Sequence, residues 1–188
     1  MMLVRSLWGC LLVLLVACSG PSFDGTSVPA RVAPNFTLLD QYGSDWTLSA
    51  QRGTDVALYF GYTHCPDDCP TTLAKLARAI SLLHTTRAEI AFVTVDPSRD
   101  TPSRFKAYLR RFHGAAIFGL TGTRAALARI YRAYGIWAQP HARNPRGGYD
   151  VAHSSPVFLI DARGMLRVVH FDSDPRSAFV HDLRVLGA

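Results

Sequence analysis

The sequence predicts an α/β sandwich, because short apolar segments typical of strands alternate along the chain with segments of helical periodicity. Residues 36–39 and 46–48 flank a turn centred on Tyr42, Gly43 and Ser44, so we expect a β-hairpin that opens the domain. Four further apolar runs are the expected strands of the main sheet: residues 56–61, 89–95, 157–161 and 166–171. The last two are joined by a turn around Arg163 and Gly164.

Helical spacing accounts for most of the sequence between these strands. Residues 71–83 place apolar side chains on one stripe of a helix: Leu73, Leu76, Ala77, Ile80 and Leu83. Residues 102–112, 123–134 and 175–186 carry the same spacing, and Pro102 and Pro175 stand where helices commonly begin. The sequence contains neither an internal repeat nor a low-complexity tract.

Composition indicates one globular domain, which we place at residues 34–188. The chain has 188 residues, of which 48% are hydrophobic and 18% charged, so it can bury a sizeable core. The formal charge of +6 is scattered, and basic residues crowd together only at Arg104, Lys106, Arg110 and Arg111. Without a motif that reads bases, this cluster indicates a solvated helix face, and we expect no nucleic-acid partner.

The N-terminal residues have the pattern of an export signal. Arg5 precedes an apolar run from Leu7 to Ala17, which is too short to span a membrane in the ordinary way. Residues 1–17 are therefore the expected signal peptide of a lipoprotein, because Leu15-Val16-Ala17-Cys18 resembles a bacterial lipobox whose cysteine is lipidated. A plain signal peptide cut nearby is the alternative. Residues 18–33 are the expected flexible tether to the extracytoplasmic, periplasmic face of a bacterial membrane.

Any thiol chemistry of the mature domain belongs to one cysteine pair. Of four cysteines, Cys10 lies in the signal and Cys18 is the expected lipid site, which leaves Cys65 and Cys69. These two follow the strand at 56–61 and stand where a helix begins, and N–H groups there stabilise thiolates. Two buried, unpaired cysteines are the structural alternative.

The spacing of the pair favours a metal over a disulfide without excluding oxidation. Residues four apart on a regular helix have Cβ atoms about 5–6 Å apart, whereas a disulfide needs about 3.5–4.5 Å. Metal bonds of about 2.3 Å to each sulfur tolerate the wider separation. Pro66 and Pro70 also predict that the pair straddles an irregular first turn.

Two thiolates need a further ligand, and His153 is the candidate. It precedes an expected strand at 154–161. Two soft thiolates with one imidazole suit cuprous copper, or zinc if a fourth ligand exists. The alternative is that His153 is an ordinary surface histidine or a hydrogen-bonded core histidine. His64 is a rival candidate for the third ligand, but its position next to Cys65 points its side chain away from the metal. The other histidines show no metal spacing: His84, His113, His141, His170 and His181.

The chain resembles the Sco/SenC family of copper proteins. Residues 60–70 match its signature of glycine, an aromatic residue, threonine and CPxxCP. Three further segments resemble the family's other motifs in the same order: residues 34–39, residues 95–102 with Val95-Asp96-Pro97 and Arg99-Asp100-Thr101-Pro102, and residues 149–161. The resemblance covers nearly all of the mature domain, from about residue 33 to residue 186.

This resemblance implies a thioredoxin-like fold with a central mixed sheet flanked by helices. It implies copper, as Cu(I), Cu(II) or both, bound by Cys65, Cys69 and His153. The implied function is that of a metallochaperone, not an enzyme, which delivers copper to the binuclear centre of cytochrome c oxidase. The alternative is a thiol-disulfide oxidoreductase that keeps the oxidase copper-site cysteines reduced, with a peroxidase as a weaker third option. The expected partners are the copper-site subunit of the oxidase and another periplasmic copper carrier or a thiol reductase.

Three residues depart from the family pattern. Asp68 replaces a residue that is often apolar, and its charge favours a cation and disfavours thiolate. Ala152 stands where an acidic residue is common, which removes one acceptor for His153. Pro156 leaves open whether its peptide bond is cis. In the family's Asp-Pro motif, we expect Asp100 to cap the helix near Pro102, with an orienting role for Asp96 and Asp100 as the alternative.

Overall fold

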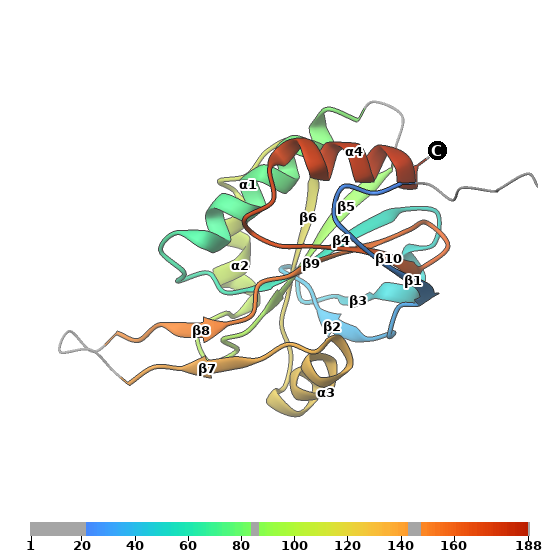
Figure 1. The fold of residues 1–188 in the computed structure, drawn as a ribbon. Coiled ribbons are helices and arrows are strands. Elements are labelled where there is room, and N and C mark those ends of the chain that lie inside the picture. The colour runs from blue at the N-terminus through green and yellow to red at the C-terminus, as the bar shows by residue number, and fades with distance from the viewer. Residues whose placement is uncertain (1–21, 84–86, 143–147, 188) are drawn as a thin grey trace, which may run out of the picture.

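The computed structural model describes residues 22–83, 87–142 and 148–187. Its largest element is a six-stranded sheet, in which the strands lie in the order β1-β10-β9-β4-β5-β6 (Figure 1). Their bounds are β1 (Thr26–Val32), β4 (Asp55–Gly61), β5 (Ala88–Thr94), β6 (Ala116–Leu120), β9 (Val157–Ile160) and β10 (Met165–His170). The predicted strands at 56–61, 89–95, 157–161 and 166–171 are thereby confirmed to within one residue at each end, whereas β1 and β6 were not predicted.

The sheet is mixed, as expected. Strands β4, β5 and β6 run parallel, while β9 is antiparallel to both β4 and β10, and β10 is antiparallel to β1. Parallel neighbours require a crossover connection, which α1 (Asp68–Ser81) and α2 (Pro102–Leu109) provide. The carboxyl ends of β4, β5 and β6 therefore meet at one edge of the sheet, and the loops that follow them lie together.

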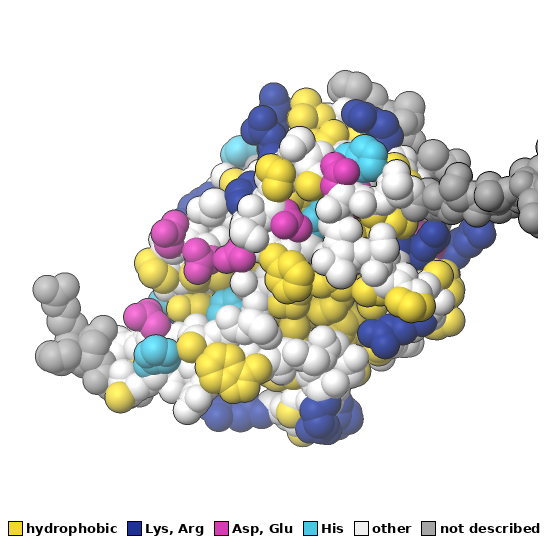
Figure 2. Space-filling view, in the orientation of Figure 1, with side chains coloured by type: hydrophobic (Ala, Val, Ile, Leu, Met, Phe, Trp, Pro, Cys, Tyr) yellow, Lys and Arg dark blue, Asp and Glu magenta, His cyan; other side chains and the backbone are white. Residues whose placement is uncertain are grey.

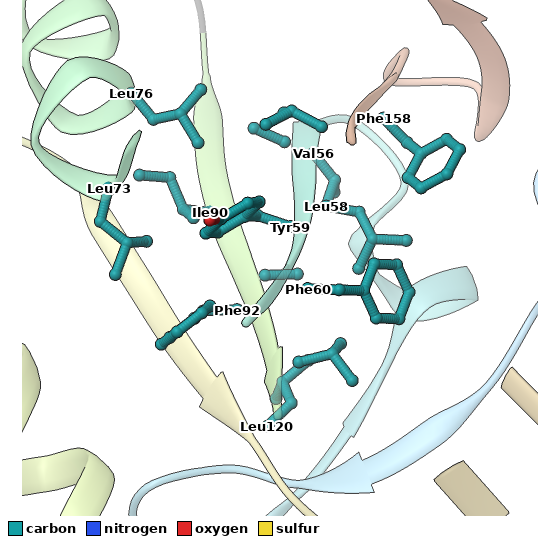
Figure 3. Close-up of a cluster of buried hydrophobic side chains, with 14 of the residues drawn as sticks. Val56, Leu58, Tyr59, Phe60, Leu73, Leu76, Ile90, Phe92, Leu120 and Phe158 are labelled. Carbon is teal, nitrogen blue, oxygen red and sulfur yellow. The ribbon is translucent and has the colours of Figure 1, made fainter. Parts of the chain in front are cut away.

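The central strand β4 is buried along its whole length and divides the core into two halves. Tyr59 stacks on Phe92 of β5, with ring centroids 5.6 Å apart, on the face that α1 and α2 cover. Phe60 points to the opposite face, where its ring meets Phe158 and Tyr134 (Figure 3). Apolar side chains therefore fill both faces, so the position of the loop after β4 is fixed by packing on two sides.

The helices form two layers around this sheet. Helices α1, α2 and α4 (Arg176–Leu186) cover one face, while α3 (Arg124–Tyr134) lies on the other with the predicted hairpin of β2 (Thr37–Leu39) and β3 (Asp45–Thr47) (Figure 1). Helix α3 begins at Thr123, whose Oγ1 accepts the N–H of Ala126 at 3.2 Å. It ends at Gly135, which has φ of 68°, a conformation that favours glycine.

A second two-stranded sheet was not predicted and carries His153. Strand β7 (Ala138–Pro140) pairs antiparallel with β8 (Val151–His153), and we call this pair the β7–β8 ribbon. The expected strand at 154–161 is wrong in its first residues, because His153 ends β8 and the sheet strand β9 begins only at Val157. His153 is therefore placed by the ribbon and not by the six-stranded sheet.

The predicted tether at 18–33 is also wrong in its second half. Thr26–Val32 forms β1, which pairs with β10 as an edge of the main sheet. Its side chains are mostly exposed, so the segment lacks the hydrophobic alternation that would have indicated a strand. The expected signal peptide at 1–17 and the lipid site Cys18 lie outside the described residues. Within those residues, no helix has both the length and the apolar character needed to cross a membrane.

A buried ionic network fastens the start of β1 to helix α4. Asp182 of α4 is completely buried and accepts the backbone N–H groups of Asp24 and Gly25 at 2.7 and 2.9 Å. The imidazole of His170, also completely buried, lies 2.9 Å from Asp182 and 2.8 Å from Asp174. These contacts support the structural interpretation of His170 and join both ends of the domain.

We expect Asp182→Ala to lower the free energy of unfolding by about 3 kcal/mol, because it leaves two backbone N–H groups without their acceptor and removes the carboxylate that lies 2.9 Å from the buried imidazole of His170. Urea unfolding of the reduced domain measures this loss. The control is Asp45→Ala on an exposed position of β3, which should change the free energy by no more than about 0.5 kcal/mol. Equal effects of the two substitutions would show that the network does not anchor β1.

Candidate metal centre

The two cysteines stand on either side of the point where helix α1 begins, as predicted. Cys65 lies in the turn after β4, and Cys69 is the second residue of α1. The backbone N–H of Cys69 donates to Cys65 Sγ at 3.4 Å, whereas the side chain of Asp67, the residue before the helix, makes no capping hydrogen bond. The sulfur of Cys65 therefore takes the place that a capping oxygen has in most helices.

The two sulfurs differ in burial. Cys69 is completely buried, and Cys65 is half-buried. A Cβ atom at Gly61 would lie 2.7 Å from Cys69 Sγ and 2.7 Å from the ring of Phe92, so only glycine leaves room for this sulfur at the end of β4. The buried sulfur is thus held by the core, while the other lies at the surface of the site.

The pair shares its protons unequally. The hydrogen bond from the Cys69 thiol lowers the pKa of Cys65 to about 4, and the backbone N–H groups of Cys69 and Asp67 lower it further. The same hydrogen bond, followed by burial, raises the pKa of Cys69. At neutral pH the reduced pair therefore consists of a thiolate at Cys65 and a thiol at Cys69.

His153 presents an unprotonated nitrogen to the buried sulfur. Its Nδ1 lies 3.0 Å from the carbonyl oxygen of Ser154, which can only accept, so Nδ1 carries the proton and donates it. In the neutral imidazole Nε2 then has a free lone pair, and it lies 3.8 Å from Cys69 Sγ. Metal bonds of about 2.3 Å to sulfur and about 2.1 Å to nitrogen, set about 120° apart, span about 3.8 Å. This donor pair therefore fits a shared metal ion.

The carbonyl of Ser154 also resolves one departure from the family pattern. Ala152 cannot orient the imidazole as an acidic side chain would, but the backbone acceptor fixes the same tautomer. The Ser155-Pro156 peptide is trans, since the described residues contain no cis bond. The acidic residue Asp68 is exposed, and desolvation followed by the charge on Cys65 raises its pKa, as expected for a carboxylate close to a thiolate.

The three donors are not drawn together as tightly as they would be around an ion. Among the residues that the structure describes, only Asp24, His181 and Asp182 bring three ligand atoms within 4.8 Å of one another. In that group Asp182 already accepts two backbone N–H groups, so its role is structural. At the cysteine site, Cys69 Sγ and His153 Nε2 lie 3.8 Å apart, so Cys65 Sγ is the donor that lies farther away.

The rival histidine and the Asp-Pro motif take other places. His64 turns away from the sulfurs: Nδ1 contacts Thr63 Oγ1 at 3.2 Å, and the Arg104 guanidinium lies 3.3 Å from Nε2.

The prediction that Asp100 caps α2 is wrong, because Thr101 Oγ1 accepts the N–H of Arg104. Asp100 is instead completely buried, and it accepts the hydroxyl of Thr63 at 2.6 Å and the backbone N–H of Thr63 at 3.1 Å.

A cleft of about 360 Å³ opens beside the cysteine turn and the β7–β8 ribbon. Acidic residues form much of its rim: Asp67, Asp68 and Asp150. Figure 2 shows acidic side chains gathered over the start of α1, although the chain as a whole is basic. Trp137, the residue before β7, lines the cleft and is 55% exposed. Sequence reasoning missed Trp137 as a lining residue, since a single aromatic residue outside a motif carries no positional signal.

A sheet edge that offers one thiolate, one buried thiol and one imidazole lone pair defines a thioredoxin-like protein with a dithiol and histidine site for a soft metal. The chain belongs to the SCO1/SenC family, whose model it matches over residues 24–186. The family resemblance of the motifs is thereby confirmed. The match also includes the segment that the sequence assigned to a tether.

Known proteins agree with this assignment. The chain is 35% identical over 150 residues to an SCO2-like protein of Rickettsia conorii, which covers 78% of this chain and 73% of the relative. The structure of copper-bound ScoI from Bradyrhizobium japonicum matches with a TM-score of 0.73 and 29% identity, over 83% of this chain and 99% of that one. Apo Sco1 from Thermus thermophilus matches with a TM-score of 0.77 and 32% identity, over 88% and 97% of the two chains.

We expect Cys65 to react with iodoacetamide as a thiolate over the whole neutral range. Because the Cys69 thiol lowers the pKa of Cys65 to about 4, the alkylation rate of the reduced protein should have its midpoint near that pH and be flat above it. Cys69 should stay unmodified until the protein unfolds. In Cys69→Ala the midpoint should move upward, because the donor is gone. A midpoint near 8.5 in the parent protein would contradict the proton sharing.

Proposed function

We propose that the folded domain binds copper between Cys65, Cys69 and His153 and delivers it to the binuclear copper centre of cytochrome c oxidase. The observation that carries this proposal is that Nε2 of His153 faces Cys69 Sγ at 3.8 Å, while Nδ1 is fixed by a carbonyl oxygen. Two sulfurs and one imidazole are a donor set that suits cuprous copper. Membership of the SCO1/SenC family and the likeness to copper-bound ScoI support the choice of metal.

The protonation state of the two cysteines suits a site that binds a copper ion and later passes it on. Cys65 is already a thiolate and lies half-buried beside the cleft, so it can meet an incoming ion first. Cys69 must lose its proton to become a ligand, and binding should therefore release about one proton at neutral pH. Delivery of the copper ion would begin when a ligand of the acceptor protein replaces Cys65, the more accessible of the two cysteines.

The oxidase is the acceptor that the family suggests. BsSco, a neighbour with 19% identity and a TM-score of 0.67, is described as a member of the Sco family of cytochrome c oxidase assembly proteins. The copper-site subunit of the oxidase is thus the first partner in our proposal, and another periplasmic copper carrier or a thiol reductase could load or reduce the site. The acidic rim of the cleft favours both the cation and a basic contact surface on such a partner.

The second candidate function is a thiol-disulfide oxidoreductase, and the unequal cysteine pair is the observation that favours it. The Cys65 thiolate would attack a disulfide of the partner, forming a mixed disulfide and releasing one partner thiolate. Deprotonated Cys69 would then attack the sulfur of Cys65, which forms the Cys65–Cys69 disulfide and releases the second partner thiolate. This reaction uses both cysteines and reduces the partner, but it does not require His153.

The proposal places the domain outside the cytoplasm, held to a bacterial membrane by lipid on Cys18. The lipobox-like residues 15–18 support this, and Phe23, at the start of the described part, is followed within a few residues by β1. A chain anchored at residue 18 therefore has only a short connection to the folded domain. The site would work close to the membrane, where an oxidase subunit is found.

We expect His153→Ala to separate the two candidate functions. The substitution removes the third ligand, so copper affinity of the reduced protein should fall at least 10-fold to 100-fold, while reduction of a model disulfide stays nearly unchanged. Titration with cuprous and cupric copper and a disulfide-reduction assay on the same protein measure both. Cys65→Ser should abolish both activities.

The matched control is His64→Ala, which removes an imidazole beside Cys65 that faces Thr63 and Arg104 and should leave copper affinity unchanged. Assembly of the oxidase is then assayed in cells that lack the native protein. If His153→Ala restores full assembly and Cys65→Ser does not, the oxidoreductase function replaces the chaperone function.

We expect Cys18→Ser to release the protein from membranes or to block its processing, while the purified domain still folds and binds copper, because residue 18 precedes β1. Membrane fractionation and mass spectrometry of the mature N-terminus measure this. An unmodified N-terminus at another residue in the parent protein would rule out the lipid anchor.

A further inference from the structure

His153 reaches the cysteine pair from an element that the main sheet does not hold. The β7–β8 ribbon forms a separate two-stranded sheet and extends from the body of the domain (Figure 1). Isolated two-stranded ribbons are marginally stable in water. Contacts between the ribbon and the rest of the domain must therefore fix the position of the imidazole relative to the two sulfurs. The ribbon's own hydrogen bonds cannot do this, since they join only β7 and β8.

A stacked arginine links the ribbon to the loop after β5. The guanidinium of Arg99 lies 3.7 Å from the ring centroid of Tyr149, just before β8. The Tyr149 hydroxyl donates to Asp96 Oδ1 at 2.8 Å, and Arg99 Nε donates to the other oxygen of the same carboxylate. Tyr149, Arg99 and Asp96 thus form a closed set of contacts, which we call the Arg99 clamp.

The same loop also holds the segment that carries the cysteines. Asp100, next to Arg99, accepts two hydrogen bonds from Thr63, and Thr94 Oγ1 donates to Asp100 at 2.7 Å. Arg99 lies 5.7 Å from the ring centroid of Tyr62. The hydroxyl of Tyr62 in turn accepts the backbone N–H of Val151, inside β8, at 3.2 Å. The loop therefore touches both ligand-bearing segments at once.

We propose that Arg99 is a positioning residue that, through Tyr149 and Asp96, sets the distance between the imidazole of His153 and the sulfur of Cys69. The ring of Tyr62 completes the support, because its centroid lies 5.8 Å from that of His153 in an edge-to-face arrangement. This inference rests on the proposed copper function. It extends that function by naming the contacts that hold His153 in place, which are separate from those that hold the cysteine pair.

A merely stabilising surface contact is the other explanation for the clamp, and the chain offers a matched comparison. Lys106 of α2 lies 5.4 Å from the ring centroid of Tyr42, and this exposed cation and aromatic pair lines a different cleft, whose lining includes neither cysteine. Only loss of Arg99 should alter the environment of His153.

The first test uses the metal-free, reduced protein. In Arg99→Gln, amide hydrogen exchange at Val151 should become at least about 10-fold faster, because the support of β8 is lost. Lys106→Gln should leave this rate unchanged. Tyr149→Phe, which keeps the stacked ring and loses only the hydrogen bond to Asp96, should give a smaller increase and serves if Arg99→Gln folds poorly. Unchanged exchange in both Arg99→Gln and Tyr149→Phe would overturn the proposal.

The second test is a double-mutant cycle with copper. Arg99→Gln should weaken copper binding about 10-fold and move the cupric absorption spectrum towards that of His153→Ala. Adding Arg99→Gln to His153→Ala should cause no further loss, because the clamp acts through that imidazole. Additive losses would show that Arg99 acts elsewhere and would overturn the proposal. If the parent protein binds no copper, the proposed function fails, and hydrogen exchange alone decides whether the clamp exists.

Discussion

The hydrogen bond from the first turn of helix α1 to the sulfur of Cys65 is the constraint on which the site depends. A helix that starts without a side-chain cap has unsatisfied N–H groups, and here an anionic sulfur at 3.4 Å accepts one of them. This arrangement stabilises the thiolate and the helix start together. It also explains why the turn from Thr63 to Cys65 must be held rigidly, as the buried carboxylate of Asp100 does.

The two sulfurs acquire different chemistry from different parts of the fold. Cys69, the second residue of α1, is completely buried, and its hydrogen bond with Cys65, followed by burial, raises its pKa and keeps it neutral. Cys65 lies at the mouth of the cleft, where N–H groups and the Cys69 thiol keep it ionised. Metal uptake and disulfide exchange both benefit from such a pair. The cysteines alone therefore do not select one function, and His153 is the residue that distinguishes them.

The proposed third ligand, His153, lies on a ribbon that, in the described part of the chain, forms no hydrogen-bonded ladder with the main sheet. The donor set is thus divided between a rigid part, formed by β4 and α1, and a part that depends on contacts of side chains from the loop after β5. The acidic rim of the cleft adds a local negative field to a chain whose formal charge is +6, which favours a cation at this edge.

The sequence by itself determined the cysteine pair, its place at a helix start, the four central strands and the helices, because apolar periodicity and proline positions are local signals. The order of the family motifs also singled out His153. Only the tertiary structure decided that residues 26–32 are an edge strand, since their exposed side chains lack alternation and their hydrogen bonds go to β10. The role of Asp100 as an acceptor for Thr63, the tautomer of His153 and the clamp at Arg99 likewise needed the fold. Each of them joins residues far apart in the chain, and no local pattern records such contacts.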